Sequence, residues 1–423
     1  MKALRLSLIV MAAALMTIGL GGMAYAFHSG GVAECGGCHS MHSPAAGGTF
    51  LLVGTDQSSA CLTCHEHAGD TGPSSYHVST APADMPAGTA PKQRSPGGDF
   101  GWLKKTYTFV VRGTTNIEEG ATHGHNIVAA DFGYAADAVN TTAPGGTFPA
   151  GSLACNSCHD PHGKYRRLST GAVATTGAPI IASGSYKTST TPTYAEPPTA
   201  GTALGVYRLL AGQGYTKGPI TYAGVPAAKA PNTYNMTEAT NQVRVAYGVA
   251  TTGGHVAWGT WCGTCHGDMH SSGNYVHPTD QGLGGTIIGL YNSYVKSGDM
   301  TGVNASAYSS LVPFITNSGD YAALAGLANN TLATSAGPTD GDQVSCLSCH
   351  RAHATAFPEM LRWQMEGEFI VYNSTFPGID NGAPAQFARG RNATENQAGY
   401  YDRPVTQFAT FQRVLCNKCH AQD

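Results

Sequence analysis

The sequence predicts a mostly irregular fold with few short helices and very little strand. The composition supports this in two ways, because the 423 residues include 55 Gly and 23 Pro and only 12% of them are charged. Chains of this kind favour turns and loops over long helices. The 20 Tyr and 13 Phe are nevertheless too many for a disordered linker. Something other than regular secondary structure must therefore organise the core.

Residues 1–26 have the pattern of a secretory signal peptide. Lys2 and Arg5 form a positive head, an apolar run follows, and Ala24-Tyr25-Ala26 resembles a cleavage site. A membrane anchor is the alternative, but the run is rich in Ala and Gly and ends at that cleavage pattern. We therefore expect a secreted protein in which residues 27–423 form a single domain. No later stretch is apolar for long enough to predict a transmembrane segment.

The charge pattern argues against a nucleic-acid partner. The formal net charge is −3, and loss of Lys2 and Arg5 with the signal peptide leaves −5. The chain also has no basic tract of the kind that follows phosphates.

All 12 cysteines belong to six CxxCH motifs. The motif residues, in order, are Cys35, Cys38 and His39; Cys61, Cys64 and His65; Cys155, Cys158 and His159; Cys262, Cys265 and His266; Cys346, Cys349 and His350; Cys416, Cys419 and His420. CxxCH is the attachment signature of c-type haem, in which two thiols bond one porphyrin and the adjacent His binds the iron. Disulfides, zinc sites and redox dithiols are alternatives, but none of them needs a His directly after the second Cys. We therefore predict a multihaem c-type cytochrome organised around six covalently bound haems.

The 17 histidines leave eleven beyond the six proximal ligands. Six of these are enough to give every iron a second imidazole. Met is the rival sixth ligand, but the seven Met that follow residue 26 show no repeated position relative to the motifs. We therefore expect bis-His irons. Irons with no open position favour electron transfer over catalysis at the metal.

Three motifs continue as CHxxH, which adds His42, His162 and His353. An offset of three residues is about one helical turn, so the second His points away from its own haem and can reach a neighbouring one. The distal candidates elsewhere in the chain are His28, His77, His125 and His277. The sequence leaves His67 and His270 open and favours a spare role for His255. Only one of His123 and His125, which lie together in HGHN, is expected to be a ligand.

The motifs are unevenly spaced, and the first and last lie close to the two ends of the mature chain. Because chain ends usually lie at the surface, we expect the terminal haems near opposite ends of the molecule. A helix is predicted from Pro404 to His420, where apolar residues share one face. Residues 286–295 and 357–365 are shorter helix candidates. Residues 170–235, rich in Thr, Pro and Gly, are expected to form a long surface loop.

Several segments resemble a family of hexahaem extracellular filament cytochromes from metal-reducing bacteria. They are FHSGGVAEC, AGDTGPSSYH, ADMPAGTAP, GGDFGW, DPHGKYRR, RVAYG, CLSCHRAHA and LCNKCHA, and all six motifs fall in the corresponding order. The resemblance implies a looped fold, six bis-His irons and head-to-tail polymerisation into filaments with haems stacked in alternating parallel and T-shaped pairs. It also implies that His42 binds the fifth haem, carried by Cys346 and Cys349, of a neighbouring subunit.

The resemblance and the motifs together predict long-range extracellular electron transfer rather than an enzymatic reaction. The implied partners are further copies of the chain, other multihaem cytochromes as electron donors, and metal oxides or electrodes as acceptors. The implied location is the exterior of a Gram-negative-type bacterium. A soluble periplasmic or surface-bound carrier is the alternative. A multihaem reductase is less favoured because it needs an iron with an open position.

Overall fold

The computed structural model describes residues 35–48, 50–74, 76–162, 166–167, 173–174, 204–205, 209–231, 233–250, 255–271 and 277–420. The expected signal peptide and His28 lie outside these residues. No helix within the described ranges is long and apolar enough to cross a membrane. That residues 27–423 form one domain stays a prediction.

Regular structure is sparse, as predicted. The α-helices of the described residues are α2 (Gln57–His65), α3 (Cys155–Cys158), α4 (Trp258–Gly263), α5 (Gly267–Ser271), α6 (Gly284–Ser293), α7 (Tyr321–Leu327), α8 (Cys346–Cys349), α9 (Ala385–Ala388), α10 (Ala393–Gly399) and α11 (Asn417–His420). The short 3-10 helices are η1 (Cys35–Gly37), η2 (Pro82–Asp84), η3 (Phe100–Lys104), η4 (Gly120–His123), η5 (Ala130–Phe132), η6 (Ala150–Ser152), η8 (Asn304–Ser306), η9 (Pro358–Met360) and η10 (Val405–Gln407).

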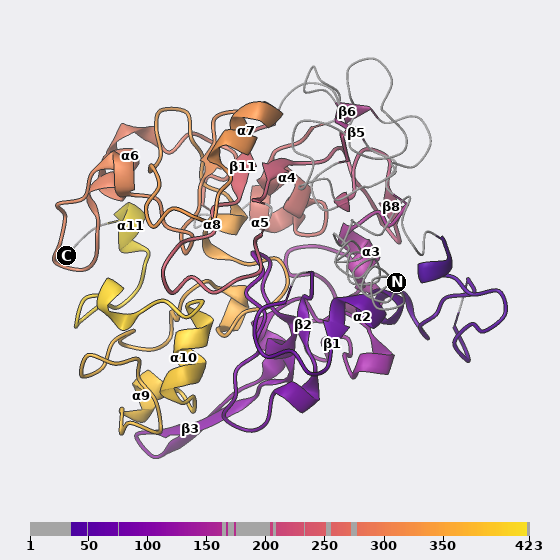
Figure 1. Ribbon diagram of the computed structural model, residues 1–423, viewed down its shortest axis with the longest axis horizontal. Coiled ribbons are helices and arrows are strands. Elements are labelled where there is room, and N and C mark those ends of the chain that lie inside the picture. Colours follow the sequence, from indigo (N-terminus) through magenta and orange to yellow (C-terminus); the bar gives the residue numbers. More distant parts are fainter. Residues whose placement is uncertain are drawn as a thin grey trace, which may run out of the picture.

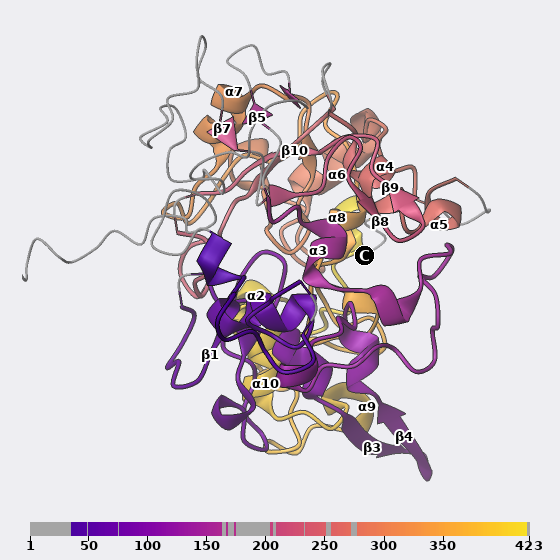
Figure 2. The same cartoon turned by 90° about the vertical axis from the view of Figure 1, so that its right-hand side faces the viewer.

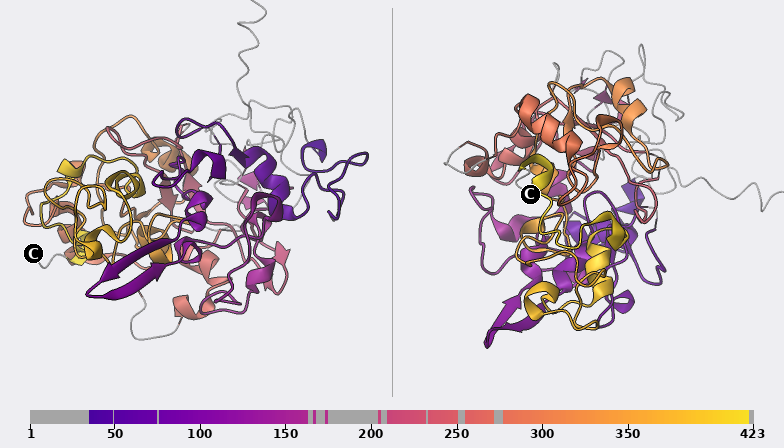
Figure 3. Two further views of the ribbon diagram at one scale, coloured as in Figure 1. Left: turned by 90° about the horizontal axis from the view of Figure 1, so that it is seen from below. Right: turned by 90° about the vertical axis from the view of Figure 1, so that its left-hand side faces the viewer.

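The strands are short and form five small sheets. Parallel β1 (Glu66–His67) and β2 (Ser79–Thr80) pair, as do antiparallel β3 (Tyr107–Val111) and β4 (Thr114–Glu118), and β8 (Thr216–Lys217) and β9 (Ile220–Thr221). The three-stranded sheets are β6 (Val173–Ala174), β5 (Arg166–Arg167) and β7 (Leu204–Gly205), and β10 (Ala227–Lys229), β11 (Ala246–Gly248) and β12 (Ile315–Thr316). The β3–β4 hairpin projects from the body in several views (Figures 2 and 3).

The first and last motifs lie at opposite ends of the longest axis, as expected (Figure 1). Helix α11, which carries the last motif, packs on α6 at one end. The segment that begins with η1 lies at the other end. The chain therefore presents one haem-binding motif at each extremity.

Two aromatic clusters make up most of the buried core. One surrounds Trp363, Phe357 and Tyr400, and its partly buried neighbours include Cys349, Cys416 and Cys419. The other surrounds Trp258, Trp261 and Tyr222, and its neighbours include Cys158, Cys262 and Cys265. The aromatic residues that set this chain apart from a linker thus pack directly beside the haem-binding cysteines.

The helix predicted from Pro404 to His420 is wrong. Only η10 and α11 form there, and Phe411 of the supposed apolar face is 74% exposed. The buried Gln412 explains the break, because its side chain bonds the Tyr294 hydroxyl and its carbonyl accepts the Ile370 N–H. These long-range bonds replace the helical bonds that the periodicity predicted.

Two further expectations need correction, and one is confirmed. Residues 357–365 do not form a helix, because Glu359 and Met360 adopt left-handed backbone conformations with φ of 58° and 57°. Residues 209–231 are largely buried rather than a surface loop, with Tyr222 and Val225 in the core beside Trp261. Residues 175–203 of that predicted loop lie outside the described residues. The helix expected at 286–295 is present as α6.

Candidate haem sites

The CxxC segments of the second, third and fifth motifs each lie within one turn of an α-helix, in α2, α3 and α8. Side chains three residues apart on a helix share a face, so both sulfurs of a motif point to one side, as attachment to a single porphyrin requires. The surrounding sequence starts these short helices. Asp56 accepts the Ser59 N–H at the start of α2, and Ser345 accepts the Leu347 N–H at the start of α8.

Consecutive motifs are neighbours in space. The Cys61 sulfur lies close enough to Cys155, and the Cys262 sulfur close enough to Cys346, to raise the pKa of Cys61 and Cys262, which places the second motif beside the third and the fourth beside the fifth. At the other steps the cysteines of neighbouring motifs lie within electrostatic reach; these are Cys38 and Cys61, Cys158 and Cys265, and Cys349 with Cys416 and Cys419. The six motifs therefore form one line that follows their order in the sequence.

Four proximal histidines are oriented by a backbone carbonyl that accepts a hydrogen bond from Nδ1. The pairs are His39 with Phe50 O (2.8 Å), His65 with Tyr76 O (2.9 Å), His266 with Pro144 O (2.8 Å) and His350 with Glu359 O (2.6 Å). This bond fixes the tautomer and leaves Nε2 for iron, which is the usual arrangement of a metal-bound His. Burial also lowers the pKa of His65 and His350, which favours the neutral ring that binds metal.

The first, third and fifth motifs share one backbone arrangement, which we call the return unit. After each motif the chain comes back so that the second Cys carbonyl accepts an N–H bond, from Val53, Ala211 and Arg362 respectively. The residue after each proximal His donates its own N–H to the returning chain, at Leu51 O, Leu209 O and Met360 O. All three of these acceptor residues have φ of 55° to 57°.

The return unit was not predicted from the sequence, although a signal for it exists. The three CHxxH motifs are followed, at different distances, by Phe50-Leu51-Leu52, Arg208-Leu209-Leu210 and Glu359-Met360-Leu361. The last Leu of each triplet forms a β-bridge with the proximal His: Leu52 with His39, Leu210 with His159, and Leu361 with His350. The repeat is hidden because left-handed non-Gly residues have no distinctive composition.

Three distal candidates face a proximal His across a gap that fits one iron. An imidazole nitrogen bonds a first-row metal at about 2.0–2.1 Å, so two rings on opposite sides of one iron have centroids about 6–6.5 Å apart. The observed centroid distances are 6.0 Å for His125 and His266, 6.4 Å for His353 and His159, and 6.2 Å for His277 and His420. Each pair joins one motif His to one sequence-predicted distal His.

His125 and His77 are also oriented for metal binding through Nδ1. His125 bonds Ala352 O at 2.7 Å, and burial lowers its pKa to about 4. His77 bonds the Asp70 carboxylate at 2.7 Å and lies within electrostatic range of His65, while its ring stacks on His67 at 5.7 Å. A carboxylate on the outer nitrogen raises the basicity of a metal-binding imidazole.

The remaining histidines differ in their surroundings. His123 is fully buried and both of its ring nitrogens are hydrogen-bonded, to Trp102 O and to Glu118, which excludes it as an iron ligand. His42 and His162 are exposed. His255 forms a backbone bridge with Val225, and the backbone of His270 lies in α5. For these residues the ligand assignments stay predictions.

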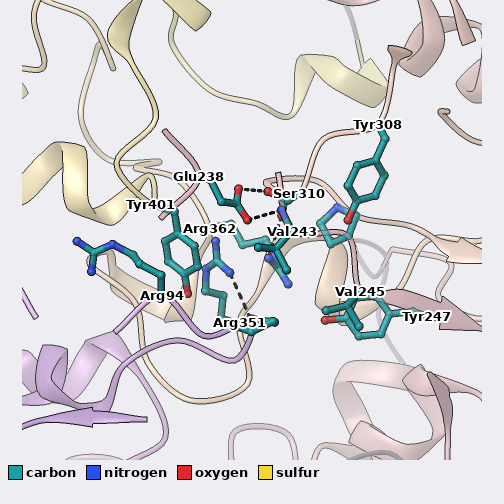
Figure 4. Close-up of a pocket in the computed structure, with 12 residues that line it drawn as sticks. Arg94, Glu238, Val243, Val245, Tyr247, Tyr308, Ser310, Arg351, Arg362 and Tyr401 are labelled. Carbon is teal, nitrogen blue, oxygen red and sulfur yellow. Dashed lines mark hydrogen bonds between the residues drawn. The ribbon is translucent and has the colours of Figure 1, made fainter. Parts of the chain in front are cut away.

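Arg351 lies in a pocket whose chemistry fits haem propionates (Figure 4). It is 3% exposed, and its Nε and Nη2 have no hydrogen-bond partner among the described residues. Burial lowers its pKa to about 10. Arg94 in the same pocket pairs with Asp402, but no carboxylate of the described chain pairs with Arg351 or its neighbour Arg362. Buried guanidinium nitrogens without a partner are costly, so an anionic propionate would fit beside Arg351. Arg362 already donates to Leu347 O, His350 O and Ser310 O.

The covalent attachment turns, the oriented imidazoles and the propionate pocket together place the chain in the class of multihaem c-type cytochromes. No family model matches the chain. Over 451 aligned positions that span all of both chains, it is 52% identical to C-type cytochrome OmcS of Geobacter sulfurreducens. Two solved structures, described as OmcS nanowires and as an outer membrane cytochrome S filament of that organism, match with TM-scores of 0.81. Their identities are 50% and 51% over 94% of this chain and all of theirs. The chain belongs to the OmcS family of c-type cytochromes.

Proposed function

We propose that this protein carries electrons over long distances outside the cell, as a filament whose haems continue from one subunit to the next. The observation that carries the proposal is the line of six attachment motifs, which starts at one end of the molecule and finishes at the other (Figure 1). Electron tunnelling falls off steeply with distance. Porphyrins attached through neighbouring sulfurs are close enough for rapid transfer along the whole chain.

The proposed ligand set makes all six irons bis-His. The ring distances support His353 for the third haem, His125 for the fourth and His277 for the sixth. The Asp70-oriented His77 is proposed for the second haem. Saturated irons leave no position for a substrate, which disfavours a reductase.

The return units suggest how the odd-numbered haems obtain their second ligand. His353 follows the fifth motif and faces His159 of the third. The second His of a CHxxH motif is therefore proposed as the distal ligand of the haem two motifs earlier. By the same rule, His162, which follows the third motif, is proposed as the distal ligand of the first haem. His42 follows the first motif, and its own chain has no earlier odd-numbered haem.

We therefore propose that His42 binds the fifth haem of a neighbouring subunit. Among the described residues, no imidazole faces His350 at the cross-iron distance, which leaves the second position of the fifth haem for a ligand such as His42 of a neighbouring subunit. His42 is exposed beside a strongly exposed apolar group, with Met41 77%, Phe50 74% and Leu51 48% exposed. Exposed apolar clusters mark interaction surfaces. A neighbouring subunit that accepts His42 covers this group.

The proposed setting follows from secretion and from the family. The signal peptide delivers the chain out of the cytoplasm, and we propose that it reaches the exterior of a Gram-negative-type bacterium. Other multihaem cytochromes are the proposed donors, and metal oxides or electrodes are the proposed acceptors. The solved relatives are described as nanowires and filaments, which supports self-assembly of this chain.

Substitution of His42 by Ala tests the proposal directly. We expect filaments to disappear from electron micrographs and one high-spin haem per subunit to appear in the resonance spectrum of the oxidised protein. His255→Ala is the control and leaves both readouts unchanged. A soluble carrier instead predicts monomers whose six haems all stay low-spin in the His42 variant. A wild-type protein that already contains a high-spin haem supports the reductase.

A further inference from the structure

Three backbone segments around Ala354 hold two distal ligands together. We call them the ligand clamp: residues 96–98, 123–125 and 353–355. His353 N donates to Gly97 O at 2.7 Å, and His125 N donates to His353 O at 2.9 Å. Thr355 N donates to His123 O at 2.9 Å, which closes the pairing on the other side of Gly124. The proposed distal ligands of the third and fourth haems are therefore neighbours on adjacent backbone segments.

The clamp is packed too closely for its segments to move independently. Ala354 is completely buried and bridges Gly98 on one side and Gly124 on the other. A Cβ on Gly124 would lie 2.4 Å from His353 O and 2.5 Å from the Ala354 Cβ. A Cβ on Gly98, where φ is +97°, would lie 1.8 Å from Ala354 O. Any displacement of residues 123–125 is therefore passed on to residues 353–355.

The ring of His123 anchors this clamp to the protein interior. Nδ1 bonds Trp102 O at 3.0 Å, and Nε2 bonds the Glu118 carboxylate at 2.8 Å. A carbonyl and a carboxylate can only accept, so the ring donates from both nitrogens. Glu118 is held in turn by Arg391 and by Arg389 Nε, the latter at 3.1 Å. The anchor is therefore a buried network of charged groups rather than a single contact.

We propose that His123 is a positioning residue that sets the ring planes of His125 and His353, and thereby the electronic state of the fourth and third haems together. This inference rests on the ligand assignment proposed above. The ring planes of His125 and His266 lie 34° apart, and those of His353 and His159 lie 59° apart. Phe100 stacks on His353 at 4.7 Å and adds a second restraint on that ring.

His123→Leu tests the inference because it removes both anchor bonds and leaves all twelve iron ligands in place. The readout is the low-spin resonance spectrum of the oxidised holoprotein, which responds to the angle between the two axial imidazole planes. We expect shifts in two of the six haem signals. His123→Gln keeps N–H donors within the anchor and should restore part of the shift. Asn396→Ala, which removes a buried bond to Pro377 O elsewhere, is the matched control and leaves all signals unchanged.

Two glycine variants check the mechanism if His123→Leu fails to fold. Gly124→Ala presses on His353 O and Ala354, so it should shift the same two signals. Gly97→Ala presses on His353 alone, because the added Cβ would lie 2.8 Å from its Nδ1, and it should shift mainly the third haem. A variant of Gly124 that folds with all six signals unchanged overturns the inference.

Ligand variants separate this inference from the proposed function. His125→Ala and His353→Ala should each convert one haem to the high-spin state. If they do not, the ligand assignment fails. If they do, but His123→Leu lowers stability without moving any haem signal, then His123 is a structural core residue and the inference is wrong.

Discussion

At the fifth motif, His350 bonds Glu359 O only nine residues further along the chain, whereas at the fourth motif His266 bonds Pro144 O, 122 residues earlier. His125, the proposed distal partner of His266, comes from the same distant part of the chain. The fifth site is thus built around its proximal His by a local return unit, and the fourth is assembled from segments that only the complete fold brings together. Local contacts form early and cost little loop entropy, while distant contacts depend on the rest of the structure.

Loss of the buried carboxylate behind the fourth site should have the largest effect. Glu118→Gln leaves Arg391 and His123 without their anionic partner, and breaking a buried ion pair in this way costs about 3–5 kcal/mol. We expect this loss in the free energy of unfolding measured with denaturant, together with weaker ligation of the fourth haem. The control is Glu366→Gln, whose carboxylate is 53% exposed and also pairs with Arg389, and which should cost about 0–1 kcal/mol.

The stability that the Glu118 carboxylate contributes to the fourth site should also depend on pH. Burial alone would raise the pKa of Glu118, but the bonds from His123 and Arg391 outweigh burial and lower the pKa to about 2. Since an unfolded Glu titrates near about 4.3, this group contributes stability above that pH and loses the contribution as pH falls through about 2. Wild-type stability should decline over this acid range, and the Glu118→Gln variant should show a shallower decline. Equal slopes for both proteins would contradict the assignment.

A smaller effect is expected where the distant segment meets the fourth motif. A Cβ on Gly146 would lie 1.8 Å from Cys265 O, so Gly146→Ala forces apart the loop that orients His266. Overpacking of this kind costs about 1–3 kcal/mol. Gly151→Ala is the control, because nothing lies within 4 Å of the added atom. Haem content and thermal unfolding would report the difference, and two variants of equal stability would count against long-range assembly of this site.

The smallest effect is expected in the return unit of the fifth site, and it has the opposite sign. Glu359 is exposed and has φ of 58°, a conformation that costs a non-Gly residue about 1–2 kcal/mol. Glu359→Gly should therefore stabilise the protein by up to about 1 kcal/mol, less the added chain entropy of Gly. The matched control is Glu119→Gly, where φ is −70°, and it should destabilise by about 0.5–1 kcal/mol. Denaturant midpoints of the two variants would test this contrast in sign.

The same comparison explains which structural predictions succeeded. The sparse secondary structure followed from Gly and Pro content, and α6 followed from a local apolar pattern. The helix from Pro404 failed because Gln412 bonds residues more than forty positions away in sequence, which no local pattern encodes. Residues 209–231 were misjudged because Thr, Pro and Gly suggest exposure, while Trp258 and Trp261 from a distant segment cover them.

The features of the candidate sites also separate into those that local sequence predicts and those that only the fold shows. CxxCH predicts every attachment site, and the CHxxH offset predicts that His353 reaches another haem rather than its own. The ring distance between His353 and His159 is consistent with that proposal. The sequence could not single out Arg351, because a buried guanidinium group with two unpartnered nitrogens is visible only in three dimensions. The sequence allowed only one of His123 and His125 to be a ligand, and the structure excludes His123 because both of its ring nitrogens are hydrogen-bonded.

The sequence by itself determined that this chain is a c-type cytochrome with six haems, because covalent attachment needs only five consecutive residues. The tertiary structure decided the order in which the motifs meet in space and which imidazole faces which. Those features depend on segments far apart in the sequence, such as residues 123–125 and 353–355, and on glycines that let them touch. The second ligand of an iron can come from any part of the chain, so it is fixed only when folding brings a distant segment to the site.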